Sequence, residues 1–234
     1  MILALPLFLQ LVGSNAPFVA PSTMASFAQH ESGMNPNAIY DNTTGQGYRP
    51  GTAAAAIAIA APLLDQGHSL DLGIMQINSA NMARTGLTVV TAFDPGQSIR
   101  AGGQIIAAAY EQCLHGKVAP TPAEQQAALR CTASVYNTGR EQAGILNGYQ
   151  AKVWRVATQL VPAIQTARAE GIEPPLSPAA AAAGADVVAP MPRRPSPGLR
   201  DTLHASPPVP DTSDELVDAL HTPRPPVQSE KEAP

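Results

Sequence analysis

Residues 21–33 read PSTMASFAQHESG, and this stretch decides the fold of the chain. Pro21 suits the first turn of a helix, where its missing amide hydrogen is not needed, and Ser22 or Thr23 can cap the exposed amides there. Gly33 is a natural left-handed stop. The stretch therefore predicts one helix that closes at Ser32.

The apolar face of this predicted helix ends in a carboxylate. Met24, Phe27 and Ala28 recur at helical spacing, and the next position on the same face is Glu31. Burial and the negative end of the helix dipole both disfavour the charged form of Glu31, so both raise its pKa toward the range of a proton donor at neutral pH. The ordinary alternative is a glutamate that meets solvent at the rim or pairs with a basic residue.

Composition divides the chain into a folded domain and a tail. Every Phe, Tyr and Trp lies at or before Trp154, whereas more than half of the 24 prolines follow Gly171. A segment so rich in proline and alanine, with no aromatic residue, cannot bury enough apolar area to offset its conformational entropy. We expect one domain over residues 1–165 and a disordered Pro/Ala-rich tail over residues 166–234. The net charge of -4 provides no basic surface for nucleic acid.

The first twelve residues are apolar, and two interpretations apply to them. Their length is that of a signal peptide, but no Lys or Arg precedes Arg49, and the small residues Ala16 and Ala20 are each followed by proline, which obstructs cleavage. We favour an ordinary packed helix over residues 3–12. The run is too short and too interrupted by proline to span a bilayer, so no stable membrane span is expected.

The cysteines and histidines suggest no metal or other cofactor. Cys113 and Cys131 lie in predicted helices on either side of one loop, where they form either a disulfide or two buried free thiols. The five histidines do not cluster at the spacing of metal ligands.

Further helices are predicted from start signals and apolar periodicity. Thr121-Pro122-Ala123-Glu124 is a capping box, and Gly139 ends the helix that it starts. Gly102 and Gly103 weaken their own helix unless another backbone packs against them. Residues 40–49 are rich in Gly, Asn and Thr and predict a loop. The expected helices span residues 53–64, an inserted segment of uncertain role, and residues 98–114, 123–137 and 150–160.

Residues 70–78 alternate partly between apolar and polar side chains and predict a short extended strand. Such a strand brings Gln76 and Asn78 to one side, and Asn78 caps the helix that follows. Two amides beside a cleft can hydrogen-bond a sugar, although such residues also tie a loop to its neighbours.

Four motifs in order resemble the lytic transglycosylases of the lysozyme-like superfamily. The similarity covers residues 1–165 and is greatest to the small members that accompany type IV secretion or conjugation systems, in which an opening like Val19-Ala20-Pro21-Ser22-Thr23 also precedes the glutamate helix. The motifs are Glu31-Ser32-Gly33 with Asn35-Pro36 and Ala38-Ile39, Asp71 to Asn78, Ala133 to Gly139, and Asn147-Gly148-Tyr149. The resemblance implies an α+β, mainly α, lysozyme-like fold with a small β element at the cleft.

The sequence departs from this family pattern in three places, one of which is that the secretion implied by the family's substrate is not matched by a clear signal sequence. Residues 40–69 are longer and richer in alanine than the resemblance implies, which affects the wall of the cleft before Gly73. Position 15, where such relatives often carry a cysteine, is Asn15, so a disulfide at the first helix is not available.

The resemblance also implies a reaction that needs one carboxylate. Glu31 would protonate the glycosidic oxygen between N-acetylmuramic acid and N-acetylglucosamine and would then take the proton of the muramoyl C6 hydroxyl, which closes a 1,6-anhydro ring. Tyr136 is the next candidate, because a phenol hydroxyl beside Glu31 can orient the carboxyl or stabilise developing charge; the alternative is a helix-end tyrosine that packs in the core. By matching motif positions, the residues predicted to bind substrate are Ser32, Gln76, Asn78, Tyr136, Asn137 and Tyr149.

Three functions follow from these observations. The first is a periplasmic lytic transglycosylase that opens peptidoglycan for a type IV secretion or conjugation apparatus, with glycan strands and components of that apparatus as partners. The second is a lysozyme-like hydrolase with Asp41 or Asp71 as the second carboxylate. The third is an inactive assembly factor whose tail recruits partners, and the intact set of polar residues around Glu31 argues against it.

Overall fold

A computed structural model describes residues 2–169. The last helix, α8 (Tyr149–Ala169), extends past the predicted end at residue 160 and past the predicted domain boundary at residue 165. The remainder of the predicted tail, residues 170–234, lies outside the described residues.

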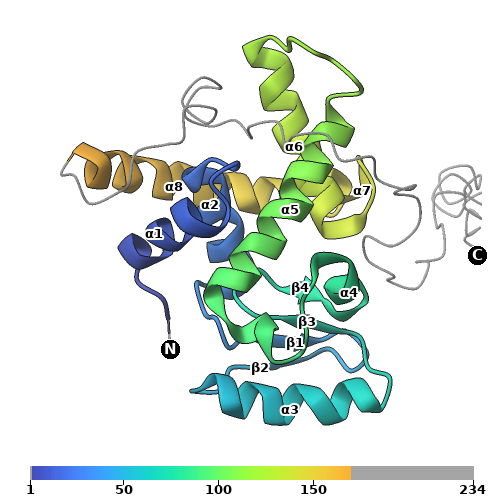
Figure 1. The fold of residues 1–234 in the computed structure, drawn as a ribbon. Helices are drawn as coiled ribbons and strands as arrows, with labels where there is room; N and C mark the ends of the chain where they lie inside the picture. Colours follow the sequence, from blue (N-terminus) through green and yellow to red (C-terminus); the bar gives the residue numbers. More distant parts are fainter. Residues whose placement is uncertain (1, 170–234) are drawn as a thin grey trace, which may run out of the picture.

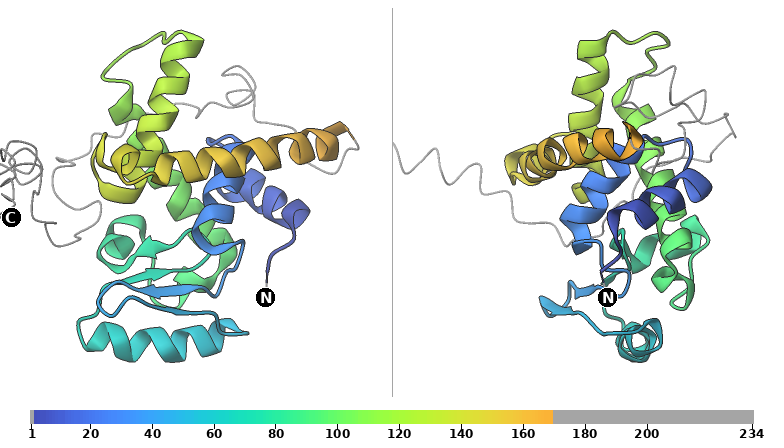
Figure 2. Two further views of the ribbon diagram at one scale, coloured as in Figure 1. Left: turned by 180° about the vertical axis from the view of Figure 1, so that it is seen from behind. Right: turned by 90° about the vertical axis from the view of Figure 1, so that its left-hand side faces the viewer.

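The described chain forms a helical layer above a small antiparallel sheet (Figure 1). Helices α1, α2, α6 and α8 lie in the upper layer, α5 runs from them down to the sheet, and α3 lies along the opposite side of the sheet (Figure 2). The predicted mainly helical α+β class is confirmed. The further elements are α1 (Leu5–Asn15), α2 (Pro21–Ser32), β1 (Ile39–Asp41), β2 (Gln46–Tyr48), α3 (Ala53–Asp65), β3 (Leu70–Leu72), β4 (Ile77–Asn78), η1 (Ser79–Asn81), α4 (Met82–Thr85), η2 (Thr91–Phe93), α5 (Pro95–Cys113), α6 (Pro122–Thr138) and α7 (Ala143–Leu146).

Helix α2 has the predicted bounds. Pro21 is its first residue, and Gly33 ends it with a φ of 65°, a left-handed conformation that glycine adopts without steric cost. The predicted cap was wrong, because Ala20 occupies the N-cap position and no side chain caps the helix. Met24 and Ala28 are fully buried, so the apolar face of α2 points into the core as expected.

The other helices are located as their sequences predict. Helix α1 buries Phe8, Leu9 and Val12 and packs against α5, which confirms a packed helix in this region. Helix α5 begins at Pro95, before the predicted start at residue 98. The Asp94 side chain caps this helix, because it accepts a hydrogen bond from the Gln97 amide at 2.8 Å. The predicted capping box of α6 is confirmed.

Two helix contacts settle questions that the sequence left open. A disulfide joins Cys113 of α5 to Cys131 of α6, with their Cα atoms 5.9 Å apart. The packing partners of Gly102 and Gly103 are side chains rather than the expected backbone, because Met75 lies against Gly102, and Ala16 lies against Gly103.

The sheet has the strand order β2-β1-β3-β4, and all its pairs are antiparallel. Residues 40–49 were expected as loop but form most of the β1–β2 hairpin, in which Tyr40 pairs with Gly47. The predicted strand over residues 70–78 was also wrong, because a turn over residues 73–76 divides it into β3 and β4. Gly73 has a φ of 77°, and a Cβ there would lie 2.1 Å from the carbonyl oxygen of Ala92, so only glycine fits.

The inserted segment forms α3, as predicted. Thr52 caps it by accepting a hydrogen bond from the Ala55 amide at 3.2 Å. Ala56 and Ala60 are fully buried, since their small side chains let the helix lie close to the rest of the domain. The segment thus supports the side of the sheet opposite to the helical layer (Figures 1 and 2).

Candidate active site

Glu31 lies in the last turn of α2 and faces a cavity of about 210 Å³. The side chain is half-buried, because the cavity keeps part of its surface open. The cavity lies between the end of α2 and the sheet. Its polar lining consists of Glu31, Tyr40, Tyr48, Arg49, Asp71 and Gln76.

The environment of Glu31 favours its protonated form. Burial raises the pKa of Glu31 to about 8; the hydrogen bond from Tyr149 acts in the opposite direction, and the negative charge of Asp71 raises the pKa further. A carboxylic acid with this pKa is mostly protonated at neutral pH and can donate its proton. The structure therefore supports the prediction that the position of Glu31 raises its pKa, with burial as the main cause.

Tyr149 makes the direct contact with the carboxyl group. Its hydroxyl donates a hydrogen bond to Oε1 of Glu31, and its ring lies edge-on to His30, with 4.9 Å between the ring centres. Asn147 orients the start of α8, because its Oδ1 accepts from the Tyr149 amide at 2.9 Å while its Nδ2 donates to Asn137 at 3.0 Å. A chain of hydrogen bonds thus leads from Asn137 through the 147–149 turn to Glu31.

Tyr136 lies close enough to Glu31 for the carboxyl charge to act on its phenol, and it also contacts the 73–76 turn. Its hydroxyl donates to the carbonyl of Met75 at 2.7 Å, and its ring packs edge-on against Phe27, with 4.9 Å between the centres. Burial, and then the charges of Glu31 and Asp71, raise the pKa of the Tyr136 phenol well above its ordinary value. Tyr136 thus fixes the 73–76 turn beside the site, and Tyr149 donates a hydrogen bond to the carboxyl of Glu31.

Ser32 and Gln76 connect the same turn to the end of α2. The buried Ser32 hydroxyl donates to the carbonyl of Ile74 at 2.8 Å. Gln76 has a φ of 47°, and its side-chain amide donates to the carbonyls of Gly73 and Ala38 at 2.8 and 3.1 Å. Gln76 lines the cavity. Ser32 holds the 73–76 turn to the end of α2 through its hydrogen bond to Ile74.

Asn78 holds the second carboxylate of the cavity. Its Nδ2 donates to Oδ1 of Asp71 at 2.8 Å and to the Ser69 hydroxyl at 3.0 Å, and its Oδ1 accepts from the Ala80 amide. Asp71 and Asn78 are paired across β3 and β4. Gln76 and Asn78 do not share one strand face as predicted, because Gln76 belongs to the turn.

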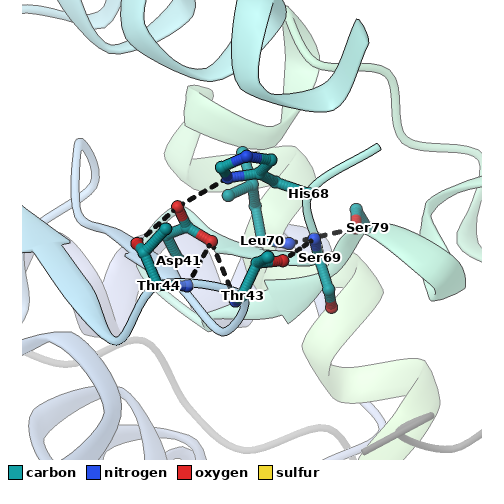
Figure 3. Close-up of polar contacts among 7 residues, drawn as sticks. All are labelled: Asp41, Thr43, Thr44, His68, Ser69, Leu70 and Ser79. Carbon is teal, nitrogen blue, oxygen red and sulfur yellow. Dashed lines mark hydrogen bonds and ion pairs between the residues drawn. The ribbon is translucent and has the colours of Figure 1, made fainter. Parts of the chain in front are cut away.

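Asp41 belongs to a separate polar cluster, which Figure 3 shows. Its carboxylate accepts from the Thr44 hydroxyl at 2.7 Å and the Thr43 amide at 2.9 Å, and it lies 2.8 Å from Nδ1 of His68. Burial on its own raises the pKa of Asp41, but the hydrogen bonds from Thr44, His68 and Thr43 outweigh it and hold that pKa at about 2. Among the described residues that line the cavity, the carboxylates are Glu31 and Asp71, so Asp71 is the better placed of the two proposed partners.

Sequence reasoning missed Tyr40, Tyr48 and Arg49. All three lie on the β1–β2 hairpin or directly after it, in the segment predicted as loop. Their signal was the placement of two tyrosines on either side of the turn, which suits paired strands. Without the hairpin, nothing in the sequence placed them beside Glu31.

A larger groove of about 370 Å³ lies between α2, α6 and α8. Phe27, Leu129, Val153 and Trp154 are among its lining residues, and none of the described lining residues is ionisable. Acid–base chemistry therefore belongs to the smaller cavity. Residues 2–169 contain neither a group of three His, Cys, Asp or Glu side chains placed to hold a metal ion nor a helix long and apolar enough to cross a membrane.

A transglycosylase SLT domain is recognised over residues 12–153, which include Glu31, Asp71, Tyr136 and Tyr149. The chain belongs to the transglycosylase SLT domain family. This SLT domain thus carries every site residue predicted from the sequence within its matched range.

Curated relatives of the SLT domain include several virB1 proteins. Protein virB1 of Agrobacterium fabrum is 42% identical over 153 residues, which are 65% of this chain and 60% of that protein. Protein virB1 of Rhizobium radiobacter is 41% identical over 160 residues, 68% of this chain and 62% of the relative. The type IV secretion system protein virB1 of Brucella abortus is 36% identical over 137 residues, 58% of this chain and 56% of the relative. The chain therefore matches less than two thirds of the length of these relatives. No solved structure matches it significantly.

Proposed function

We propose that this SLT domain is a peptidoglycan lytic transglycosylase. It cleaves the β-1,4 bond between N-acetylmuramic acid and N-acetylglucosamine and leaves 1,6-anhydro-muramoyl ends. The observation that carries the proposal is Glu31, whose pKa is raised to about 8 at the edge of a polar cavity. A neutral carboxylic acid in that place is the group that the first step of the reaction requires.

In the first step, Glu31 acts as a general acid. Its proton moves to the glycosidic oxygen while the bond from that oxygen to C1 of the muramoyl residue breaks. The N-acetylglucosamine unit leaves with a C4 hydroxyl, and positive charge develops at C1. Glu31 becomes a carboxylate, which the hydroxyl of Tyr149 stabilises by donating a hydrogen bond.

In the second step, the same carboxylate acts as a base. It accepts the proton of the muramoyl C6 hydroxyl as the C6 oxygen forms a bond to C1. This closes the 1,6-anhydro ring and returns Glu31 to its protonated form. No water is consumed, so atoms and protons balance over the two steps with one titrating residue.

A second candidate is hydrolysis, which the position of Asp71 favours. Asp71 lines the same cavity as Glu31 and is held there by Asn78. As a carboxylate it can activate water or form a covalent intermediate, as the second acid of a glycosidase does. The product then carries a reducing end in place of the anhydro ring.

Mass spectrometry of digested peptidoglycan separates these candidates. Purified protein is incubated with isolated sacculi, and the released muropeptides are compared with those from the Glu31→Gln variant. Anhydro ends, which are lighter than reducing ends by one water, support the transglycosylase. Reducing ends support the hydrolase, and an absence of products from a folded protein supports an assembly factor without activity.

We further propose that the enzyme works in the periplasm, where it opens the cell wall for a type IV secretion or conjugation apparatus and contacts its components. The similarity to proteins named virB1 and type IV secretion system protein virB1 supports this role. The test is complementation of a bacterium that lacks its own virB1. Expression of this chain should restore substrate transfer, and the Glu31→Gln variant should not.

A further inference from the structure

Arg49 is anchored beside the catalytic acid by the backbone. It directly follows β2, and its Nη1 donates a hydrogen bond at 2.9 Å to the carbonyl of Ser32, the residue after Glu31. This bond uses one of the five N–H groups of a guanidinium. The side chain is otherwise exposed and lines the cavity.

The end of α2 is already closed without the Arg49 side chain. Gly33 already ends the helix in a left-handed conformation, and its amide donates to the carbonyl of Gln29 at 3.1 Å. A neutral donor could also satisfy the Ser32 carbonyl, although a cation at the negative end of the α2 dipole adds a modest stabilisation. The remaining N–H groups of the Arg49 guanidinium can therefore bind another group in the cavity.

Arg49 is the single cationic side chain among the described residues that line the cavity. The other ionisable groups there are the carboxyls of Glu31 and Asp71 and the phenols of Tyr40 and Tyr48. Neutral donors and aromatic faces are sufficient to bind a neutral sugar ring, so the charge itself needs another explanation. A fixed guanidinium suits a carboxylate, to which it can donate two parallel hydrogen bonds.

We propose that Arg49 is a specificity residue that binds a carboxylate carried by the C3 lactyl group of the muramoyl residue. The inference rests on the proposed action on peptidoglycan. A muramoyl residue differs from N-acetylglucosamine by this lactyl ether, which ends either in its own carboxylate or in a peptide that carries carboxylates. Arg49 therefore distinguishes muramoyl units from N-acetylglucosamine units at the subsite next to Glu31.

Calorimetry with three oligosaccharides tests this role. The full chain with Glu31→Gln binds its ligand without turnover, and it is compared with the Glu31→Gln/Arg49→Gln double variant. The ligands are a peptide-bearing muramoyl oligomer, the same oligomer freed of peptide so that the lactyl carboxylate is exposed, and an N-acetylglucosamine oligomer of equal length. Arg49→Gln should weaken binding of a carboxylate-bearing ligand by about 10- to 100-fold, the range of a hydrogen-bonded charged pair, and change the N-acetylglucosamine oligomer by less than about twofold.

The two muramoyl ligands identify the source of the carboxylate. A loss restricted to the peptide-bearing oligomer assigns the partner to the peptide, whereas a loss with the peptide-free oligomer assigns it to the lactyl group. Either result supports the proposal. Equal losses with all three ligands, or no loss with any, overturn it.

Matched controls separate charge recognition from folding. Arg155→Gln removes an exposed arginine of α8 and should change no affinity, whereas Arg49→Lys keeps the charge without the planar fork and should bind with intermediate affinity.

If Arg49→Gln fails to fold, amidation of the ligand carboxylates replaces this variant as the test. The Glu31→Gln protein should then lose the same 10- to 100-fold in affinity, and an unchanged affinity contradicts the proposal. Anhydro products from the unaltered enzyme test the reaction itself, so failure of one proposal is distinguishable from failure of the other.

Discussion

Tyr149 donates a hydrogen bond to Glu31 across 118 residues of sequence. The contact forms because α8 begins where α2 ends, and the two helices pack along each other. It places a phenol hydroxyl on the carboxyl that is proposed to give up and regain a proton. A donor in this position stabilises the carboxylate, while burial of the same group favours its protonated form.

Glu31→Gln should remove activity and preserve the fold. The amide neither protonates the leaving oxygen nor accepts the C6 proton, so release of anhydro-muropeptides should fall by at least about 10²–10⁴-fold, the scale of one general acid or base step. Turnover of isolated sacculi measures it. Glu111→Gln, at an exposed position of α5, is the control and should keep the parent rate.

The difference in stability between Glu31→Gln and the parent should change in favour of the variant as the pH rises. The pKa of Glu31 is about 8 in the folded chain, above its ordinary value, so unfolding releases a proton between the two pKa values and parent stability falls as pH rises through this window. Glutamine does not titrate. Urea unfolding at pH 4 and pH 8 should show the stability of the variant relative to the parent to be higher at pH 8, and a difference that is the same at both pH values contradicts a raised pKa of Glu31.

The sequence was sufficient to place Glu31 but not its neighbours. The helical spacing of Met24, Phe27 and Ala28, with proline and glycine at the ends, determines which face of α2 is buried and hence where Glu31 points. Local patterns also located α6 and the capping box at its start.

The contacts around Glu31 depend on tertiary structure. The turn over residues 73–76 requires positive φ at Gly73 and Gln76, which partial alternation over residues 70–78 does not indicate. Which of two tyrosines reaches Glu31 depends on the packing of α6 and α8 against α2. Arg49 enters the cavity because the β1–β2 hairpin folds beside α2, a pairing that the Gly, Asn and Thr content of the segment obscured.

Asp41→Asn should destabilise the domain without a specific effect on catalysis. The carboxylate is fully buried and accepts bonds from Thr43, Thr44 and His68. An asparagine has one acceptor oxygen in place of two, so at least one of these donors loses its partner, and the free energy of unfolding should fall by about 1–3 kcal/mol at pH 7. Urea titration measures the loss, and Asp65→Asn, at an exposed position of α3, should cost little.

The effect of Asp41→Asn should also depend on pH. The pKa of Asp41 is lowered to about 2 in the folded chain, so its charge contributes stability above the unfolded pKa of about 4, and this contribution is lost as pH falls toward 2. The difference between parent and variant should therefore shrink from pH 7 to pH 3. A difference that stays constant over this range contradicts an electrostatic origin.

Gly102→Ala should disturb the site from a distance. A Cβ at this position of α5 would lie 2.9 Å from Cβ of Met75, whose carbonyl accepts the hydrogen bond from Tyr136. Overpacking costs about 1–3 kcal/mol, against a gain in helix propensity of about 1 kcal/mol, so a net loss of stability and of activity is expected. Thermal unfolding and sacculus digestion measure both. Gly51→Ala is the control, since its Cβ would meet nothing within 4 Å, and equal behaviour of the two variants would show that the contact with Met75 is unimportant.

Tyr149→Phe and Asp71→Asn should shift the pH dependence of the reaction in opposite directions. The hydrogen bond from Tyr149 lowers the pKa of Glu31, and the charge of Asp71 raises it. Because the protonated form of Glu31 starts the reaction, kcat/KM should decline above pH 8 in the parent. The decline should move to higher pH in Tyr149→Phe and to lower pH in Asp71→Asn. Profiles of kcat/KM with soluble muramoyl oligomers measure these shifts.

The directions of these two pH shifts distinguish residues that set the pKa of Glu31 from residues that only support the fold. Tyr149→Phe should also lower kcat, because the carboxylate formed in the first step loses its donor. A change that only loosened the site would reduce kcat/KM equally at every pH and leave the alkaline decline where it was. Tyr40→Phe is the control: it alters a half-exposed phenol of the same cavity, and Tyr40 does not contribute to the pKa of Glu31, so its profile should keep the position of the parent. Shifts of both variants in the same direction would contradict the electrostatic assignment of Glu31.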